Sequence, residues 1–253
     1  MSRNIWTECG ASSRLRRLAL PAWRAVESQT LTATRKLVDS DEEQALLEDL
    51  IEAAKPPVPQ DPELAGLHFL LYTPFRYPPL AHGSRFGTRL ERGIWYGSRE
   101  LRTVFAEVAY YRLLFLEGPA ADLGSITIEL SAFQARVATT RGVDLTAAPF
   151  RAHAREISSR TRYDAAQRLG REMRAADVAA FLYASARDPE GGASIGLFRP
   201  AFARRRPTTP ETWVCTATRD KVELSKKDVF RRQRFLFPRA AFEVGGRLPA
   251  PAL

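Results

Sequence analysis

The sequence predicts an α+β fold, because segments with the period of strands and segments with the period of helices are interspersed along the chain. Residues 126–130 alternate between apolar and polar side chains, as a half-buried strand does. Residues 98–118 place apolar side chains at helical spacing. Residues 181–198 carry two apolar segments around a Pro-Glu-Gly-Gly turn, which is typical of a hairpin. We therefore expect small mixed or antiparallel sheets flanked by helices.

The first quarter of the chain is predicted to form a helical N-terminal extension. Residues 1–17 look irregular, and residues 20–27 predict a short strand or an extended entry into the fold. Asp39 and Ser40 cap a predicted helix over residues 39–55, which has acids in its first turn and an apolar stripe. Prolines between residues 56 and 62 end that helix and form a stiff linker. We place the extension at residues 1–62, packing on a main domain at residues 63–253.

The main domain is predicted to begin with a strand in the apolar run 67–72. A proline-containing loop follows, and then a short strand at residues 94–96. Ser98 is the predicted N-cap of the helix that carries Glu107. An Arg-rich segment near residues 165–176 predicts a further helix, and residues 213–218 predict a last strand before a basic tail that follows Ser225.

The composition argues against several classes of protein. The two cysteines, Cys9 and Cys215, provide neither a disulfide framework nor metal-ligand spacing, and the three histidines are scattered, so no metal is expected. No apolar run approaches the roughly 20 residues of a membrane helix, and the N-terminus does not resemble a secretory signal, so a cytoplasmic protein is expected. The net charge of +9 suits an anionic ligand or an acidic partner. No nucleic-acid motif accompanies that charge, and direct nucleic-acid binding is not expected.

Two loops present arginines that suit a phosphate pair. Arg76, followed by Tyr77 and two prolines, is held in a rigid segment, and Arg85 lies between Gly83 and Gly87. A planar guanidinium binds two phosphate oxygens at once, and flanking glycines allow the backbone to approach a ligand closely. For each arginine taken alone, a solvated surface position is the commoner role.

Three further residues interrupt apolar patterns. Tyr96 ends a short strand, where its ring can stack on a planar ligand. Glu107 lies beside the apolar stripe of its helix, so its carboxylate is either solvated or directed into a cleft. Ser185 ends an apolar segment just before a turn, where its hydroxyl reaches a ligand or caps the turn.

The order of these passages is more specific than any one of them, because Arg85, Tyr96 and Glu107 follow one another at intervals of eleven residues. Together RYPPLAHGSRFG, GIWYGSRELRTVFAEVAYYR and YASARDPEGGASIGLF resemble the RES domain, which is named for its Arg, Glu and Ser. Its members are toxins of RES–Xre toxin–antitoxin modules. The resemblance covers roughly residues 23–198, and WRAVESQ and TRKLVDSDEEQ are similar to the branch described as mono-ADP-ribosyltransferase toxins. The chain departs from the family in a lengthy insertion between Glu107 and Ser185 and in its basic tail.

The resemblance implies an ADP-ribosyltransferase-like RES fold that binds NAD+ as its substrate. It implies catalytic roles for Tyr96 against nicotinamide, for Glu107 at the oxocarbenium-like ribose, and for Ser185 on the substrate or on Glu107. It also implies that the pyrophosphate is held by Arg76 and Arg85, with Tyr77 shaping the pocket wall.

The acceptor of the ADP-ribose group stays open between a protein side chain, water and phosphate. The resemblance slightly favours protein ADP-ribosylation over NAD+ glycohydrolase or phosphorylase activity. It also implies a cognate Xre-like antitoxin that covers the cleft. A different class remains as the alternative, namely a non-catalytic binding protein whose basic surface holds nucleic acid or an acidic partner.

Overall fold

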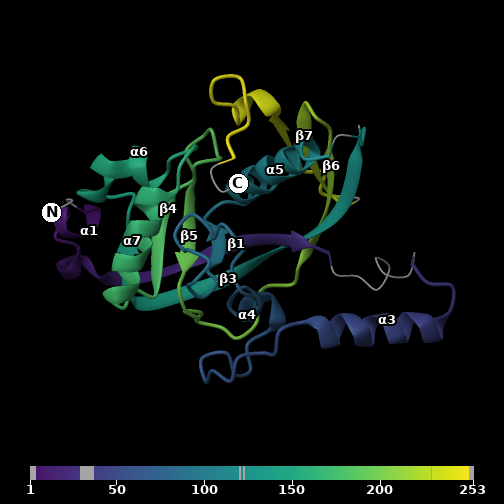
Figure 1. Ribbon diagram of the computed structural model, residues 1–253, viewed down its shortest axis with the longest axis horizontal. Helices are drawn as coiled ribbons and strands as arrows, with labels where there is room; N and C mark the ends of the chain where they lie inside the picture. The colour runs from purple at the N-terminus through teal and green to yellow at the C-terminus, as the bar shows by residue number, and fades with distance from the viewer. Residues whose placement is uncertain (1–3, 29–36, 120, 122, 229, 251–253) are drawn as a thin grey trace.

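A computed structural model describes residues 4–28, 37–119, 121, 123–228 and 230–250. Within them the chain forms a mixed eight-stranded sheet with six α-helices around it, so the predicted α+β class is confirmed (Figure 1). The strand order is β1-β2-β5-β4-β3-β6-β7-β8, and β1 also pairs with β3. The first five strands of this order therefore close on themselves, and the other three extend the sheet beyond β3.

Two long strands organise this sheet. Strand β1 (Arg16–Glu27) runs antiparallel to β3 (Ile126–Asp144) along most of its length. The first part of β3 pairs with β6, and its last residues pair in parallel with β4. The remaining strands are β2 (Trp95–Ser98), β4 (Ala180–Ala184), β5 (Ala193–Leu197), β6 (Glu211–Ala217), β7 (Lys221–Lys226) and β8 (Arg234–Pro238).

Two helices cover parts of the sheet that border the site. Helix α5 (Leu101–Glu117) packs buried side chains such as Phe105 against Trp213 and Leu224 of β6 and β7. Helix α7 (Asp164–Ala175) packs Leu169 and Met173 against β4. The predictions of a helix around Glu107, a helix near residues 165–176 and a hairpin at 181–198 are confirmed. No described helix is long and apolar enough to cross a membrane.

The N-terminal region contains both confirmed and corrected predictions. Ser40 caps α3 (Asp41–Ala54) by accepting a 3.1 Å hydrogen bond from the Glu43 amide, as expected. Residues 4–17 are not irregular throughout, because they include α1 (Ile5–Glu8) and a 3-10 turn before β1 begins. Residues 1–3, together with residues 34–36 of the TRKLVDSDEEQ passage, lie outside the described residues.

The prediction of a strand at residues 67–72 is wrong, because this run belongs to α4 (Phe69–Arg76). Its buried residues Leu71 and Phe75 are four apart, the spacing of one helical face, and the His68 ring accepts a hydrogen bond from the Leu70 amide as N-cap. A short apolar run cannot be assigned to strand or helix by its pattern alone.

Two other boundaries differ from the predictions. Ser98 does not cap the helix but ends β2, and α5 begins after Glu100 without a side-chain cap. The strand at 213–218 is confirmed as β6, but it is not the last one. Residues after Ser225 form a basic hairpin with β8, so they are not simply a tail. The short helix α6 (Ala154–Ile157) and two 3-10 turns, at residues 150–153 and 239–241, complete the described elements.

Candidate functional site

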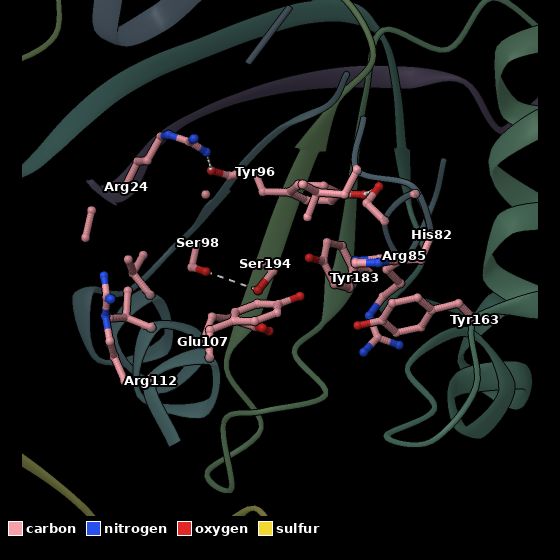
Figure 2. Close-up of a pocket in the computed structure, with 18 of the residues that line it drawn as sticks. Arg24, His82, Arg85, Tyr96, Ser98, Glu107, Arg112, Tyr163, Tyr183 and Ser194 are labelled. Carbon is pink, nitrogen blue, oxygen red and sulfur yellow. Dashed lines mark hydrogen bonds between the residues drawn. The ribbon is translucent and has the colours of Figure 1, made fainter. Parts of the chain in front are cut away.

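A cavity of about 560 Å³ opens between β2, α5 and the loop before β2 (Figure 2). Its volume lies within the range of small-molecule sites, about 300–1,000 Å³. Three of the predicted site residues, Arg85, Tyr96 and Glu107, line it. The other polar or aromatic lining residues are Arg24, His82, Ser84, Ser98, Tyr111, Arg112, Phe115, Tyr163, Tyr183 and Ser194.

Glu107 reaches the cavity from α5 and is held from behind by Ser185. The Ser185 hydroxyl donates a 2.8 Å hydrogen bond to Glu107 Oε1. Ser185 Oγ in turn accepts hydrogen bonds from the amides of Arg187 at 3.2 Å and Asp188 at 3.1 Å. A serine hydroxyl has one proton and two lone pairs, so these two amides leave Glu107 as the acceptor of that proton. Ser185 is buried and does not line the cavity. It therefore contacts Glu107 but not the open cavity.

Tyr96 links the cavity to the loop that carries Arg85. Its hydroxyl lies 2.9 Å from Ser84 Oγ and accepts a 3.2 Å hydrogen bond from the Phe86 amide. Burial raises the pKa of Tyr96 to about 12, so the phenol keeps its proton at neutral pH. Gly83 begins the loop with a φ of 72°, and a Cβ there would overlap the backbone of Gly87. The loop is therefore tight, and the contacts of the Tyr96 hydroxyl with Ser84 and Phe86 hold it in place.

Arg85 lies in the wall of the cavity with only 7% of its surface exposed. Its Nη1 donates a 2.7 Å hydrogen bond to the Ser159 carbonyl, and its guanidinium stacks on Tyr163 at 4.7 Å from the ring centre. No carboxylate of the described residues forms an ion pair with it. A buried cation without a counter-charge costs free energy, and an anionic ligand in the cavity would offset that cost.

Arg24 is a second cationic lining residue, and sequence reasoning missed it. It comes from β1, donates a 2.6 Å hydrogen bond from Nη1 to the Tyr96 carbonyl, and has a buried Nε without a partner in the described part of the chain. Burial lowers the pKa of Arg24 to about 10. Figure 2 shows Arg24 and Arg85 on opposite sides of the cavity, with Glu107 between them. The available signal was a charged residue inside the predicted strand 20–27.

The prediction that Arg76 and Tyr77 belong to this site is wrong as to placement, because neither residue lines the cavity. Arg76 ends α4, and its guanidinium points to the linker after α3. There Nε donates a 2.5 Å hydrogen bond to the Pro56 carbonyl, and Nη2 lies 3.4 Å from Glu52 Oε1. Tyr77 packs beside it, with the ring centre 5.9 Å from the guanidinium carbon. The helical conformation of residues 69–76 therefore directs Arg76 to a structural contact.

Aromatic side chains that the sequence did not single out form much of the remaining lining. Tyr183 of β4 meets Tyr96 edge to face, with ring centres 6.4 Å apart. Burial raises the pKa of Tyr183 well above its ordinary value, and the negative charge of Glu107 contributes to the shift. Ser98 and Ser194, paired across β2 and β5 with 3.1 Å between their hydroxyl oxygens, lie between Tyr96 and Glu107 (Figure 2). The cavity thus combines aromatic walls, three arginines (Arg24, Arg85 and Arg112) and one positioned carboxylate.

This combination, in an α+β fold, suits an anionic ligand that carries planar rings. A family model described as RES domain matches residues 62–216, more than half of the chain. The chain therefore belongs to the RES domain family, which is known from toxin–antitoxin systems and is associated with NAD+ use. No curated protein matches the chain.

Proposed function

We propose that this chain is the toxin of a type II toxin–antitoxin module that cleaves the nicotinamide–ribose bond of NAD+ and transfers ADP-ribose to a target protein. The observation that carries the proposal is Glu107, whose carboxylate faces the cavity while Ser185 fixes its orientation at 2.8 Å. Within the described residues Glu107 forms no ion pair, so its charge is available to a ligand. A carboxylate prepared in this way stabilises positive charge that develops in a transition state.

The cavity walls support NAD+ as the substrate. The buried Arg85 and the partly buried Arg24 lack carboxylate partners among the described residues, and a pyrophosphate supplies the missing negative charge. The rings of Tyr96 and Tyr183 provide apolar surface for the planar nicotinamide. Arg24 thus has the role of binding the pyrophosphate that sequence reasoning assigned to Arg76.

The reaction follows from the charge of the leaving group. When the bond between the anomeric carbon and the nicotinamide nitrogen breaks, the electron pair stays on the nitrogen, and neutral nicotinamide leaves. The ribose then carries an oxocarbenium-like charge beside Glu107. A nucleophile of the target protein attacks the anomeric carbon and loses its proton to solvent. Water or phosphate as the nucleophile would instead make the chain an NAD+ glycohydrolase or phosphorylase.

We also propose that an acidic Xre-like antitoxin covers the cavity. The net charge of +9 favours association with an acidic protein, and the cavity of the proposed active site is not enclosed.

The proposed function is tested by incubating the purified chain with NAD+ and measuring released nicotinamide, with and without a cell extract as the source of acceptor protein. Extract-dependent release, with ADP-ribose recovered on protein, is the expected result. Release without protein modification would identify water or phosphate as the acceptor and contradict the transferase proposal. Intact NAD+ combined with salt-sensitive DNA binding would instead favour the non-catalytic binding protein.

A further inference from the structure

The turn that presents Ser185 to Glu107 is attached to α5 by two buried side chains. Thr103 lies one helical turn before Glu107 on the same face of α5 and is fully buried. Its hydroxyl donates a 2.7 Å hydrogen bond to Asp188 Oδ2. Asp188 lies three residues after Ser185, and its side chain is only 1% exposed. One face of α5 therefore holds both ends of the short segment 185–188.

The surroundings of Asp188 strengthen this attachment. Its Oδ1 pairs with Arg102 and accepts a 3.1 Å hydrogen bond from the Glu190 amide. Gly192 accepts a 2.8 Å hydrogen bond from the Ser185 amide through its carbonyl. A Cβ at Gly192 would overlap Thr103 Oγ1 and Asp188 Oδ2, so only glycine leaves room for their contact.

We propose that Thr103 and Asp188 are positioning residues that hold the Ser185 hydroxyl within reach of Glu107. The amides of Arg187 and Asp188 occupy both lone pairs of the Ser185 hydroxyl, which leaves its proton for Glu107. The hydrogen bond between Thr103 and Asp188 ties the residue that supplies one of these amides to α5. Removing the Thr103 hydroxyl leaves Asp188 Oδ2 buried without that donor, which favours local opening of the turn. Neither residue touches the cavity.

The first test measures the turn without any reference to NAD+. Thr103→Val keeps the shape of the side chain and removes its hydroxyl. We expect the amides of Arg187 and Asp188 to exchange with deuterium about tenfold faster, since ~1.4 kcal/mol of local stability corresponds to that factor. Thr103→Ser keeps the hydroxyl and should retain slow exchange. Unchanged exchange in folded Thr103→Val would overturn the proposal.

The second test is kinetic and rests on the proposed function. Thr103→Val should lower kcat for nicotinamide release by about tenfold and leave KM within about twofold, because misplaced groups affect the transition state more than binding. In a Ser185→Ala background the same change should cost less than about twofold, because residues acting through one contact are not additive. Glu190→Gln, at an exposed residue that also pairs with Arg102, is the control and should be neutral.

The outcomes of the two tests separate the two proposals. Equal kcat losses in both backgrounds would show that Thr103 does not act through Ser185 and would overturn the positioning role. A wild-type chain that releases no nicotinamide would contradict the proposed function, and the amide-exchange result would then decide the positioning role alone. Thermal unfolding of each variant confirms that the protein measured is folded.

Discussion

The guanidinium carbon of Arg85 lies 4.7 Å from the ring centre of Tyr163, and both side chains line the same cavity. Stacking on a ring leaves the edges of a guanidinium available to an anion. The Ser159 carbonyl takes one of its donors, at 2.7 Å from Nη1. Arg85 is thus oriented before a ligand arrives, so little of its side-chain entropy remains to be lost on binding.

Arg85→Ala should weaken NAD+ binding by about tenfold or more, because a hydrogen bond to a charged group contributes about 1.5–3 kcal/mol. The pyrophosphate is bound in the ground state and in the transition state alike, so kcat should change much less. Arg76→Ala is the matched control, since that arginine contacts the linker outside the cavity. Calorimetric titration with NAD+ checks both variants, and equal losses of affinity would contradict the assignment of Arg85.

Glu107→Gln should show the opposite balance. The amide keeps the shape and an acceptor for the Ser185 hydroxyl but removes the charge that faces the ribose. We expect single-turnover nicotinamide release to fall by about 10²-fold or more, with NAD+ affinity nearly unchanged, as for other preorganised electrostatic groups. Cells should tolerate expression of this variant where the wild type stops growth. Near-normal turnover in Glu107→Gln would remove the carboxylate from the proposed mechanism.

The stability of the protein should fall at alkaline pH. Burial raises the pKa of Tyr96 and of Tyr110 to about 12, above the value of about 10 in an unfolded chain. The folded state therefore binds these protons more tightly. Its advantage is complete below about pH 10 and is lost as the pH rises through about 12. Urea unfolding across this range should show the decline, and Tyr96→Phe should make it shallower. An unchanged slope in that variant would contradict the pKa shift of Tyr96.

The proposed antitoxin should inhibit by covering the cavity. We expect the chain to co-purify with an Xre-like protein encoded beside it, and the saturated complex to release no nicotinamide. Because the proposed attraction is partly electrostatic, association should slow as salt is added. Nicotinamide release from the complex and from the free chain measures the effect. Full activity in a saturated complex would rule out occlusion.

The sequence by itself determined several of the local elements and the positions of Glu107 and Ser185 within them. The helical period over residues 101–117 places Glu107 beside an apolar face, and the turn after an apolar strand places Ser185 at a strand end, as the structure confirms. Such patterns succeed because burial of one face repeats with the period of the element itself. The prediction failed for residues 67–72, because such a short apolar run fits the period of a strand and the period of a helix equally well.

Only the tertiary structure decided which distant side chains meet. Arg24 reaches the cavity because β1 pairs with both β2 and β3, although Arg24 and Tyr96 are 72 residues apart in the chain. Arg76 leaves the predicted site because α4 directs it to the linker at Pro56. Likewise Thr103 and Asp188 meet across 85 residues. Contacts of this kind depend on how the strands pair and the helices pack, and the periodicity of a single segment carries no information about its partners.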